Sequence, residues 1–344
     1  MMDAYEIIEA LCSQKGVSGR EKSAVAAARN ILKEYPCETD ALGNLIATVR
    51  EAQPGEKTVV LEAHIDRIGL MVSYIDDEDF LRVQRAGGVD PHTLMGSELI
   101  VTDKKGEDVT GVVGLPFPYP AKPHNTVADS EREMPAIDEM RIDTGFEKPG
   151  ERVRLGAEAI MKADIFRLLG TRVAAPCLDD RACCASLILA AQLLKNEDIR
   201  CGLKLLLSTR EEIGGMGAMT GVFPLDADEA IAVDVTTGDA PDVKEEESTC
   251  LGKGPQIDIA PILSDSLTNR LIDIAKKENI PYQLFVDARS TGTDADEMTT
   301  VGRGVRTALV SLPIRFMHHP VETLDLTDVD AAAKLLAAYV KEVR

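Results

Sequence analysis

The feature that most restricts the fold is an alternation of segments with helical and strand periodicity. Apolar residues recur at helical spacing in EKSAVAAARNILKEY (21–35) and ASLILAAQLLKN (185–196), whereas KTVVLEAHI (57–65) and CGLKLLLST (201–209) have the pattern of buried strands. The C-terminal third continues in the same way, with strands expected at 229–236, 282–288 and 306–314 and helices at 264–279 and 328–343. This alternation predicts an α/β fold.

The periodicity changes between residues 67 and 163. Short β-like runs, among them DFLRVQRAG (79–87) and ERVRLGA (151–157), are separated by Gly, Pro and Asp. We therefore expect a small β-rich domain at 67–163, inserted between segments 1–66 and 164–344 of one α/β domain.

Charge and composition exclude several classes of partner. The formal net charge of -20 would repel a phosphate backbone, which argues against nucleic acid. The 344 residues contain no apolar run of about 18 residues, so no membrane span is expected. Seven cysteines show no paired framework, and the first residues do not resemble a secretory signal. These features predict a cytoplasmic protein.

Several polar residues lie at the ends of the expected strands. His64 and Asp66 are two residues apart, so on a strand they share a face, and the carboxylate can fix the imidazole tautomer for a metal. A histidine satisfied within the core is the alternative interpretation. Asp234 ends an apolar strand, where a carboxylate is costly to bury unless it is paired or bound to a cation.

Two further pairs extend this pattern. Asp179 and Asp180 stand at the start of a helix, where aspartates also serve as caps. His318 and His319 follow the expected strand at 306–314, and Pro320 prevents the strand from continuing.

Two glutamates, Glu211 and Glu212, stand side by side after the strand at 201–209 and before a glycine-rich stretch. That stretch, GGMG, lacks the spacing of a phosphate-binding loop. Adjacent side chains point in different directions, so one carboxylate can bind a metal while the other accepts a proton from water.

The candidate residues all follow strands, and in open α/β sheets the carboxyl ends of the strands carry the ligands. Oxygen and nitrogen donors without thiolates suit Zn, Co or Mn, and two such ions can share one carboxylate. The combined pattern predicts a dinuclear metal site.

Six stretches together resemble the tetrahedral (TET) aminopeptidases, a family of dinuclear metallopeptidases that includes glutamyl and deblocking aminopeptidases. They are AHIDRIG, LDDRA, STREEIGGMGA, AVDVT, STGTDAD and IRFMHHPVET, and they occur in order over nearly the whole chain. STGTDAD taken alone has the composition of a polar turn, whereas the resemblance places it at the active site, with glycine and hydroxyl groups able to line a substrate cleft. The resemblance implies a mixed-sheet catalytic domain with a small β-rich inserted domain for assembly.

The resemblance also implies roles for individual residues. The implied metal ligands are His64, Asp179, Glu212, Asp234 and His318, with Asp179 bridging two ions. Glu211 would be the general base, Asp66 would orient His64, and the Asp179–Asp180 peptide would be cis. His319 would stay outside the ligand shell, and Arg67 stands where the family more often has a carboxylate.

The implied activity is removal of N-terminal residues from short peptides by two divalent ions per chain, Zn, Co or Mn. The implied assembly is a homo-oligomer, with a tetrahedral dodecamer as the family's form. The alternatives are a related metal-dependent amidase, deacylase or carboxypeptidase, and a non-catalytic, metal-stabilised binding or scaffold protein.

Overall fold

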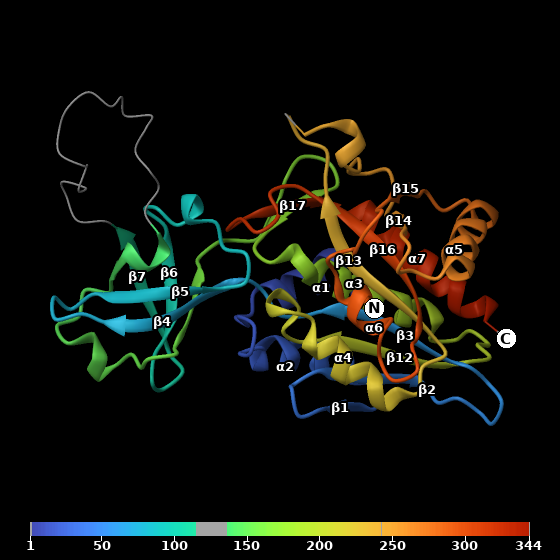
Figure 1. Ribbon diagram of the computed structural model, residues 1–344, viewed down its shortest axis with the longest axis horizontal. Helices are drawn as coiled ribbons and strands as arrows, with labels where there is room; N and C mark the ends of the chain where they lie inside the picture. The colour runs from blue at the N-terminus through green and yellow to red at the C-terminus, as the bar shows by residue number, and fades with distance from the viewer. Residues whose placement is uncertain (1, 115–135, 242, 344) are drawn as a thin grey trace. The chain divides into compact units, whose positions relative to one another are not determined.

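The computed structural model describes residues 2–114, 136–241 and 243–343 (Figure 1). The chain divides into two compact units, the first comprising Met1–Arg67, Asp164–Met317 and Val321–Arg344 and the second comprising Ile68–Ala163 and His318–Pro320. Residues 115–135 of the expected insert lie outside the described residues. Among the described residues, none of the helices has the length and apolarity needed to cross a membrane.

The first unit is built on an eight-stranded mixed sheet with the strand order β1-β2-β12-β3-β13-β16-β14-β15. The strands are β1 (Cys37–Thr39), β2 (Leu45–Arg50), β3 (Thr58–His64), β12 (Gly202–Ser208), β13 (Glu229–Thr237), β14 (Gln256–Ile259), β15 (Gln283–Val286) and β16 (Arg306–Ile314). The four central neighbours β12, β3, β13 and β16 run parallel, so their carboxyl ends meet at one edge. The predicted α/β fold with a mixed sheet is confirmed.

Helices cover both faces of this sheet. They are α1 (Ala4–Cys12), α2 (Lys22–Ile31), α3 (Leu178–Leu194), α4 (Met216–Val222), α5 (Asp265–Glu278), α6 (Asp294–Met298) and α7 (Leu326–Glu342). Alternate residues of β3 enter different cores: Val59 and Leu61 pack with α1, α3 and α7, whereas Val60 packs with α4 and α6. Two-sided burial explains why the central strands are predominantly apolar. A small separate sheet contains β10 (Phe166–Arg167), β11 (Arg172–Ala175) and β17 (Glu322–Asp325).

The second unit is a closed barrel with the strand order β4-β5-β8-β7-β6-β9 and its own apolar core. Its strands are β4 (Gly69–Ile75), β5 (Leu81–Ala86), β6 (Glu98–Thr102), β7 (Asp108–Gly114), β8 (Arg141–Asp143) and β9 (Glu158–Met161). The expected strand at 151–157 is wrong, because a 3-10 turn at Pro149–Glu151 and a turn at Gly156, with φ 75°, interrupt the backbone before β9 begins.

Candidate metal centre

The ends of the parallel strands supply the first residues of the site. His64 is the last residue of β3 and lies opposite Ser208, the last residue of β12. Asp234 lies on β13 opposite Ser311 of β16. Parallel pairing therefore brings together side chains that are far apart in the chain.

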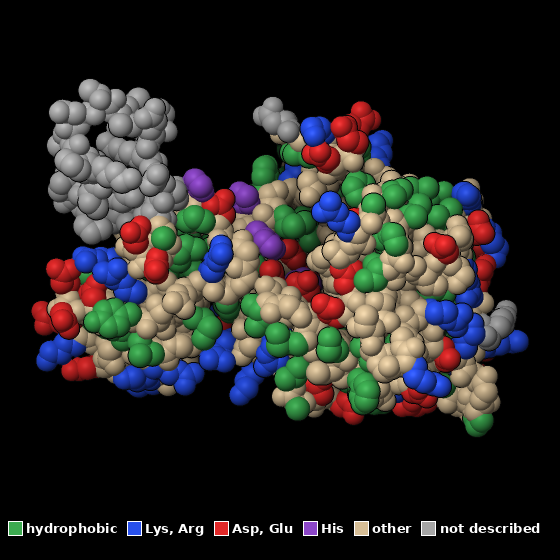
Figure 2. Space-filling view, viewed as in Figure 1, with side chains coloured by type: hydrophobic (Ala, Val, Ile, Leu, Met, Phe, Trp, Pro, Cys, Tyr) green, Lys and Arg blue, Asp and Glu red, His purple; other side chains and the backbone are tan. Residues whose placement is uncertain are grey.

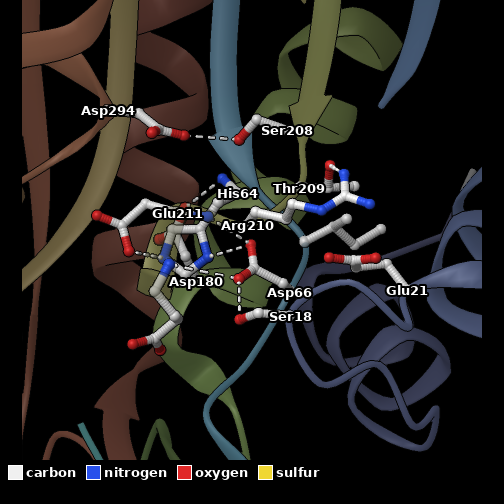
Figure 3. Close-up of polar contacts among 12 residues, drawn as sticks. Ser18, Glu21, His64, Asp66, Asp180, Ser208, Thr209, Arg210, Glu211 and Asp294 are labelled. Atoms are coloured by element: carbon white, nitrogen blue, oxygen red, sulfur yellow. Dashed lines mark hydrogen bonds and ion pairs between the residues drawn. The ribbon is translucent and has the colours of Figure 1, made fainter. Parts of the chain in front are cut away.

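His64 stands among carboxylates (Figure 3). Its Nε2 atom lies 3.1 Å from Oδ1 of Asp179 and 3.8 Å from Oε2 of Glu211. Its Nδ1 atom lies 3.5 Å from Oδ1 of Asp66. Burial opposes charge on the ring, but the adjacent carboxylates of Asp179 and Asp66 hold the pKa of His64 well above its ordinary value.

Asp66 connects His64 to residues 209–217, the glutamate segment, which carries Glu211 and Glu212. The Ser18 hydroxyl donates to Asp66 Oδ2 at 2.6 Å, and the backbone N–H groups of Glu211 and Glu212 donate to the same carboxylate at 3.1 and 3.4 Å. Burial opposes ionisation, yet the contact with His64 and these hydrogen bonds lower the pKa of Asp66. A fully buried, ionised Asp66 thus aligns the imidazole and the glutamate segment together.

The glutamate segment follows a tight path. Arg210 adopts a left-handed conformation with φ 63°, and residues Glu211–Ile213 form a single 3-10 turn. A Cβ atom at Gly217 would lie 1.9 Å from the carbonyl oxygen of Thr209, so only glycine allows the chain to pass here.

The peptide bond between Asp179 and Asp180 is cis, as expected. Both residues have non-helical dihedral angles inside α3, so they lie in a kink at its start. The Asp179 N–H donates to Oε2 of Glu322 at 3.0 Å, and Asp180 Oδ2 accepts from the His64 N–H at 3.0 Å. These bonds join the two aspartates to residues outside the helix, Glu322 and His64, so the aspartates do more than cap the start of α3.

The side-chain donor atoms fall into two groups in which all atoms lie within 4.8 Å of one another. One group is His64, Asp180 and Asp234, and the other is Asp179, Glu212 and His318. All five ligands expected from the sequence are therefore in these groups. Asp180 is an additional member, which sequence reasoning had placed beside the ligands without a donor role. Asp179 also contacts His64, so its carboxylate reaches both groups.

Burial and mutual repulsion dominate the electrostatics of the site. Burial raises the pKa of Glu211 to about 9, and the carboxylates of Asp234, Asp294 and Glu212 add to this effect while His64 opposes it. Burial likewise raises the pKa of Asp234 to about 8, with a contribution from Asp179. Carboxylates crowded in a buried site are ionised together only when positive charge neutralises them. The donor set, of oxygen and imidazole nitrogen atoms, fits divalent Zn, Co or Mn.

Three buried residues beside the site were not singled out from the sequence. The Ser208 hydroxyl oxygen lies 2.6 Å from Glu62 Oε1 and 2.7 Å from Asp294 Oδ2. One hydroxyl proton can serve only one of these carboxylates at a time, so the other contact requires a proton on an acid. Asp294 belongs to STGTDAD, which thus contributes a carboxylate next to the end of β12. The hydroxyls of Thr291 and Thr293 instead bond to each other within the turn.

The remaining candidates have different environments. His319 belongs to neither group of donor atoms. Arg67 is buried, with 2% of its surface exposed, and its backbone N–H donates to the carbonyl of Gly16.

Gly88 is a further residue that the sequence did not single out. A Cβ atom at this position would lie 2.5 Å from Nδ1 of His318. We expect Gly88→Ala to displace the imidazole of His318 and to weaken metal binding by about tenfold or more. This is the usual loss of metal affinity when a group that orients a ligand is changed. Titration of bound metal against a competing chelator measures this effect.

Gly114 provides the matched control, because it lies in the same unit and a Cβ atom there has no neighbour within 4 Å among the described residues. Gly114→Ala is expected to bind metal like the unmodified chain. Equal metal affinity in the two variants would show that close packing on Gly88 does not hold His318.

Comparisons with known proteins agree with this architecture. The sequence model of the M42 glutamyl aminopeptidase family matches residues 43–335. A lysyl aminopeptidase from Pyrococcus furiosus is 35% identical over 347 residues, covering 99% of this chain and 97% of the relative.

Solved structures show the same fold. An aminopeptidase from the archaeon Desulfurococcus kamchatkensis has a TM-score of 0.90 and 31% identity, covering 98% of this chain and 94% of that one. The TET1 peptidase of Pyrococcus horikoshii has a TM-score of 0.83 and 29% identity, covering 99% and 100% of the two chains. The expected resemblance to the tetrahedral aminopeptidases is confirmed, and this chain belongs to the M42 glutamyl aminopeptidase family of metal-dependent aminopeptidases.

Proposed function

We propose that this aminopeptidase removes N-terminal residues from short peptides at a centre of two divalent ions, Zn, Co or Mn. The proposed ligands are His64, Asp179, Glu212, Asp234 and His318, with Asp179 shared between the ions. The main support is the pair of adjoining donor groups, which Asp179 links through its 3.1 Å contact with His64. Divalent cations at such a centre supply Lewis acidity toward the scissile carbonyl and lower the pKa of water.

Glu211 is the proposed general base. Its Oε2 atom lies at the edge of the donor groups, 3.8 Å from His64, and it belongs to neither group. It takes a proton from the attacking water as the C–O bond forms, and it delivers that proton to the departing amine nitrogen as the C–N bond breaks.

Asp66 is the proposed positioning residue. It holds the His64 ring through Nδ1 and the N–H groups of Glu211 and Glu212 through its two oxygens. A ligand, a base and a second ligand are thereby aligned by one buried carboxylate.

The other interpretations of the sequence are less well supported. The family and the curated relatives are aminopeptidases, which does not favour an amidase, a deacylase or a carboxypeptidase. A non-catalytic scaffold is not favoured either, since the donor groups occur together with a separate candidate base.

A peptide-library digest tests the proposed function. We expect the metal-loaded protein to release free N-terminal amino acids, detected by mass, and to leave N-acetylated copies of the same peptides intact. Treatment with a chelator should abolish release, and Zn, Co or Mn should restore it. Release of C-terminal residues, or full activity after the metal has been removed, would contradict the proposal.

We also propose that the chain forms a homo-oligomer, with a tetrahedral dodecamer as the working form. The support is the TET1 peptidase of Pyrococcus horikoshii, which assembles into a tetrahedron or a large octahedral shell. Light scattering at micromolar concentration measures the assembly directly. The seven cysteines are all free, which supports a cytoplasmic location.

A further inference from the structure

A pocket of about 890 Å³ lies in the first unit, away from the donor groups of the metal centre. Helix α2 forms one wall, the loop at residues 39–43 forms another, and Arg210 completes the lining. Val25, Ala26 and Leu42 contribute apolar surface to it. The pocket is large enough for a small organic molecule.

Four cationic side chains line this pocket: Lys22, Arg29, Lys33 and Arg210. Within the described part of the chain, none of the four is in ion-pair contact with a carboxylate. Arg29 donates to the carbonyl of Cys37 and to the Thr39 hydroxyl, and Arg210 Nη1 donates to the Leu42 carbonyl at 2.5 Å. Both guanidinium groups are thus held in place by neutral acceptors and not by carboxylates.

The two acidic residues of the pocket are occupied by other contacts. Asp40 Oδ1 accepts from the N–H groups of Leu42, Gly43 and Asn44 at 2.9 to 3.1 Å, and its Oδ2 accepts from the Asn44 side chain at 2.6 Å. Glu21 is buried, and its Oε1 accepts from the Gly19 N–H. The lining therefore has an excess of positive charge in a chain whose net charge is -20. Elsewhere, acidic and basic side chains are interspersed over the visible face (Figure 2).

Asn44, the residue that follows the pocket loop at 39–43, is bonded to both ends of the glutamate segment. Asn44 Oδ1 accepts from the Thr209 N–H at 2.8 Å, and Asn44 Nδ2 donates to the Gly217 carbonyl at 2.8 Å. Arg210 directly precedes Glu211, and Figure 3 shows its side chain extending away from Glu211 and His64, toward Thr209 and Glu21. A movement of this wall would therefore reach the residues on both sides of the candidate base.

We propose that this pocket binds a small organic anion carrying two or more negative charges, and that its occupancy modulates turnover through Arg210. The four unpaired cations supply the attraction, and the apolar wall accommodates a short carbon body. An anion on the Arg210 guanidinium competes with the Leu42 carbonyl for the same N–H donors. Occupancy thus loosens the link between the pocket wall and the glutamate segment, and we expect kcat to fall.

Ethanedisulfonate is the probe of choice, since sulfonates coordinate divalent metals poorly and leave the metal centre free. We expect calorimetry on the metal-loaded protein to show one saturable site per chain. The double variant Lys22→Gln/Lys33→Gln should bind the probe about tenfold more weakly, because two exposed charge contacts are lost. The control Lys253→Gln/Lys276→Gln removes the same charge at other exposed lysines and should bind within about twofold of the unmodified chain.

Competition with the probe then distinguishes two classes of anion, phosphate esters and dicarboxylates. Glycerol phosphate represents phosphate esters and succinate represents dicarboxylates, and the better competitor for the probe identifies the class. Binding that is absent, or that weakens equally in both double variants, would overturn the proposed site.

Turnover supplies the second readout. We expect saturating probe to lower kcat by about twofold or more in the unmodified chain and in the control variant, with KM nearly constant. Binding with no change in kcat would overturn the coupling through Arg210. The binding assay does not depend on peptide hydrolysis, so its result stands apart from the test of the proposed function.

Discussion

Glu211→Gln is expected to lower kcat by about a hundredfold or more, the usual scale for loss of a positioned base, while metal content stays near that of the unmodified protein. Glutamine keeps the size of the side chain and loses its capacity to accept a proton from water. The backbone contact from the Glu211 N–H to Asp66 is unaffected by this change, so the segment should keep its position. Parallel measurement of bound metal and of turnover at saturating metal tests this expectation.

The neighbouring glutamate is a matched control, because Glu212→Gln makes the same chemical change one residue away. Glu212 shares a donor group with Asp179 and His318, and an amide is a poorer ligand than a carboxylate for Zn, Co or Mn. Unlike Glu211→Gln, this variant should bind less metal than the unmodified protein, and excess metal should recover part of its activity. The reverse pattern, with metal lost in Glu211→Gln and retained in an inactive Glu212→Gln, would exchange the two roles.

Asp179→Asn is expected to weaken the binding of both metal ions and to abolish measurable turnover at limiting metal. Its carboxylate belongs to the group with Glu212 and His318, and it also lies 3.1 Å from Nε2 of His64 in the other group. Changing a residue that only hydrogen-bonds a metal ligand typically lowers metal affinity by about 10- to 100-fold. Loss of a shared ligand should lower the affinity for each ion by at least as much. Elemental analysis after dialysis against a defined free metal concentration measures the number of ions retained per chain.

Asp258→Asn provides a control for removal of a buried carboxylate outside the donor groups. Asp258 is buried on β14, where it accepts from Gln256 and from the Ser311 hydroxyl. We expect this variant to retain both metal ions, whatever it costs in stability. If Asp179→Asn retained two tightly bound ions as well, the shared position would have to be assigned to another residue, and Asp180 is the nearest candidate.

The sequence alone determined the fold class and most of the elements around the site. Helical and strand periodicity predicted α2, β3, β12, β13 and β16 close to their observed bounds, since these segments bury continuous apolar surface in a way that their composition reveals. The order of ligand-type residues after the strands also pointed to a metal site. Parallel pairing gives the physical reason for this expectation, because it places the carboxyl ends of neighbouring strands at one edge.

Local pattern was misleading where backbone turns decide the structure. The alternation in ERVRLGA has the appearance of a strand, but a 3-10 turn before it and the left-handed Gly156 within it prevent pairing until β9. Periodicity reports which side chains can be buried, and it does not report where the backbone must turn.

Only the tertiary structure decided which polar groups support the site. The contact of Ser208 with Glu62 and Asp294, the packing of His318 on Gly88, and the bonds from Asn44 to Thr209 and Gly217 each join residues far apart in the chain. Such contacts depend on distances of a few ångströms between separate elements, and no local periodicity encodes them. The sequence therefore supplied the candidate ligands, whereas folding determined which groups contact them and which pocket lies beside the segment that carries two of the candidate residues.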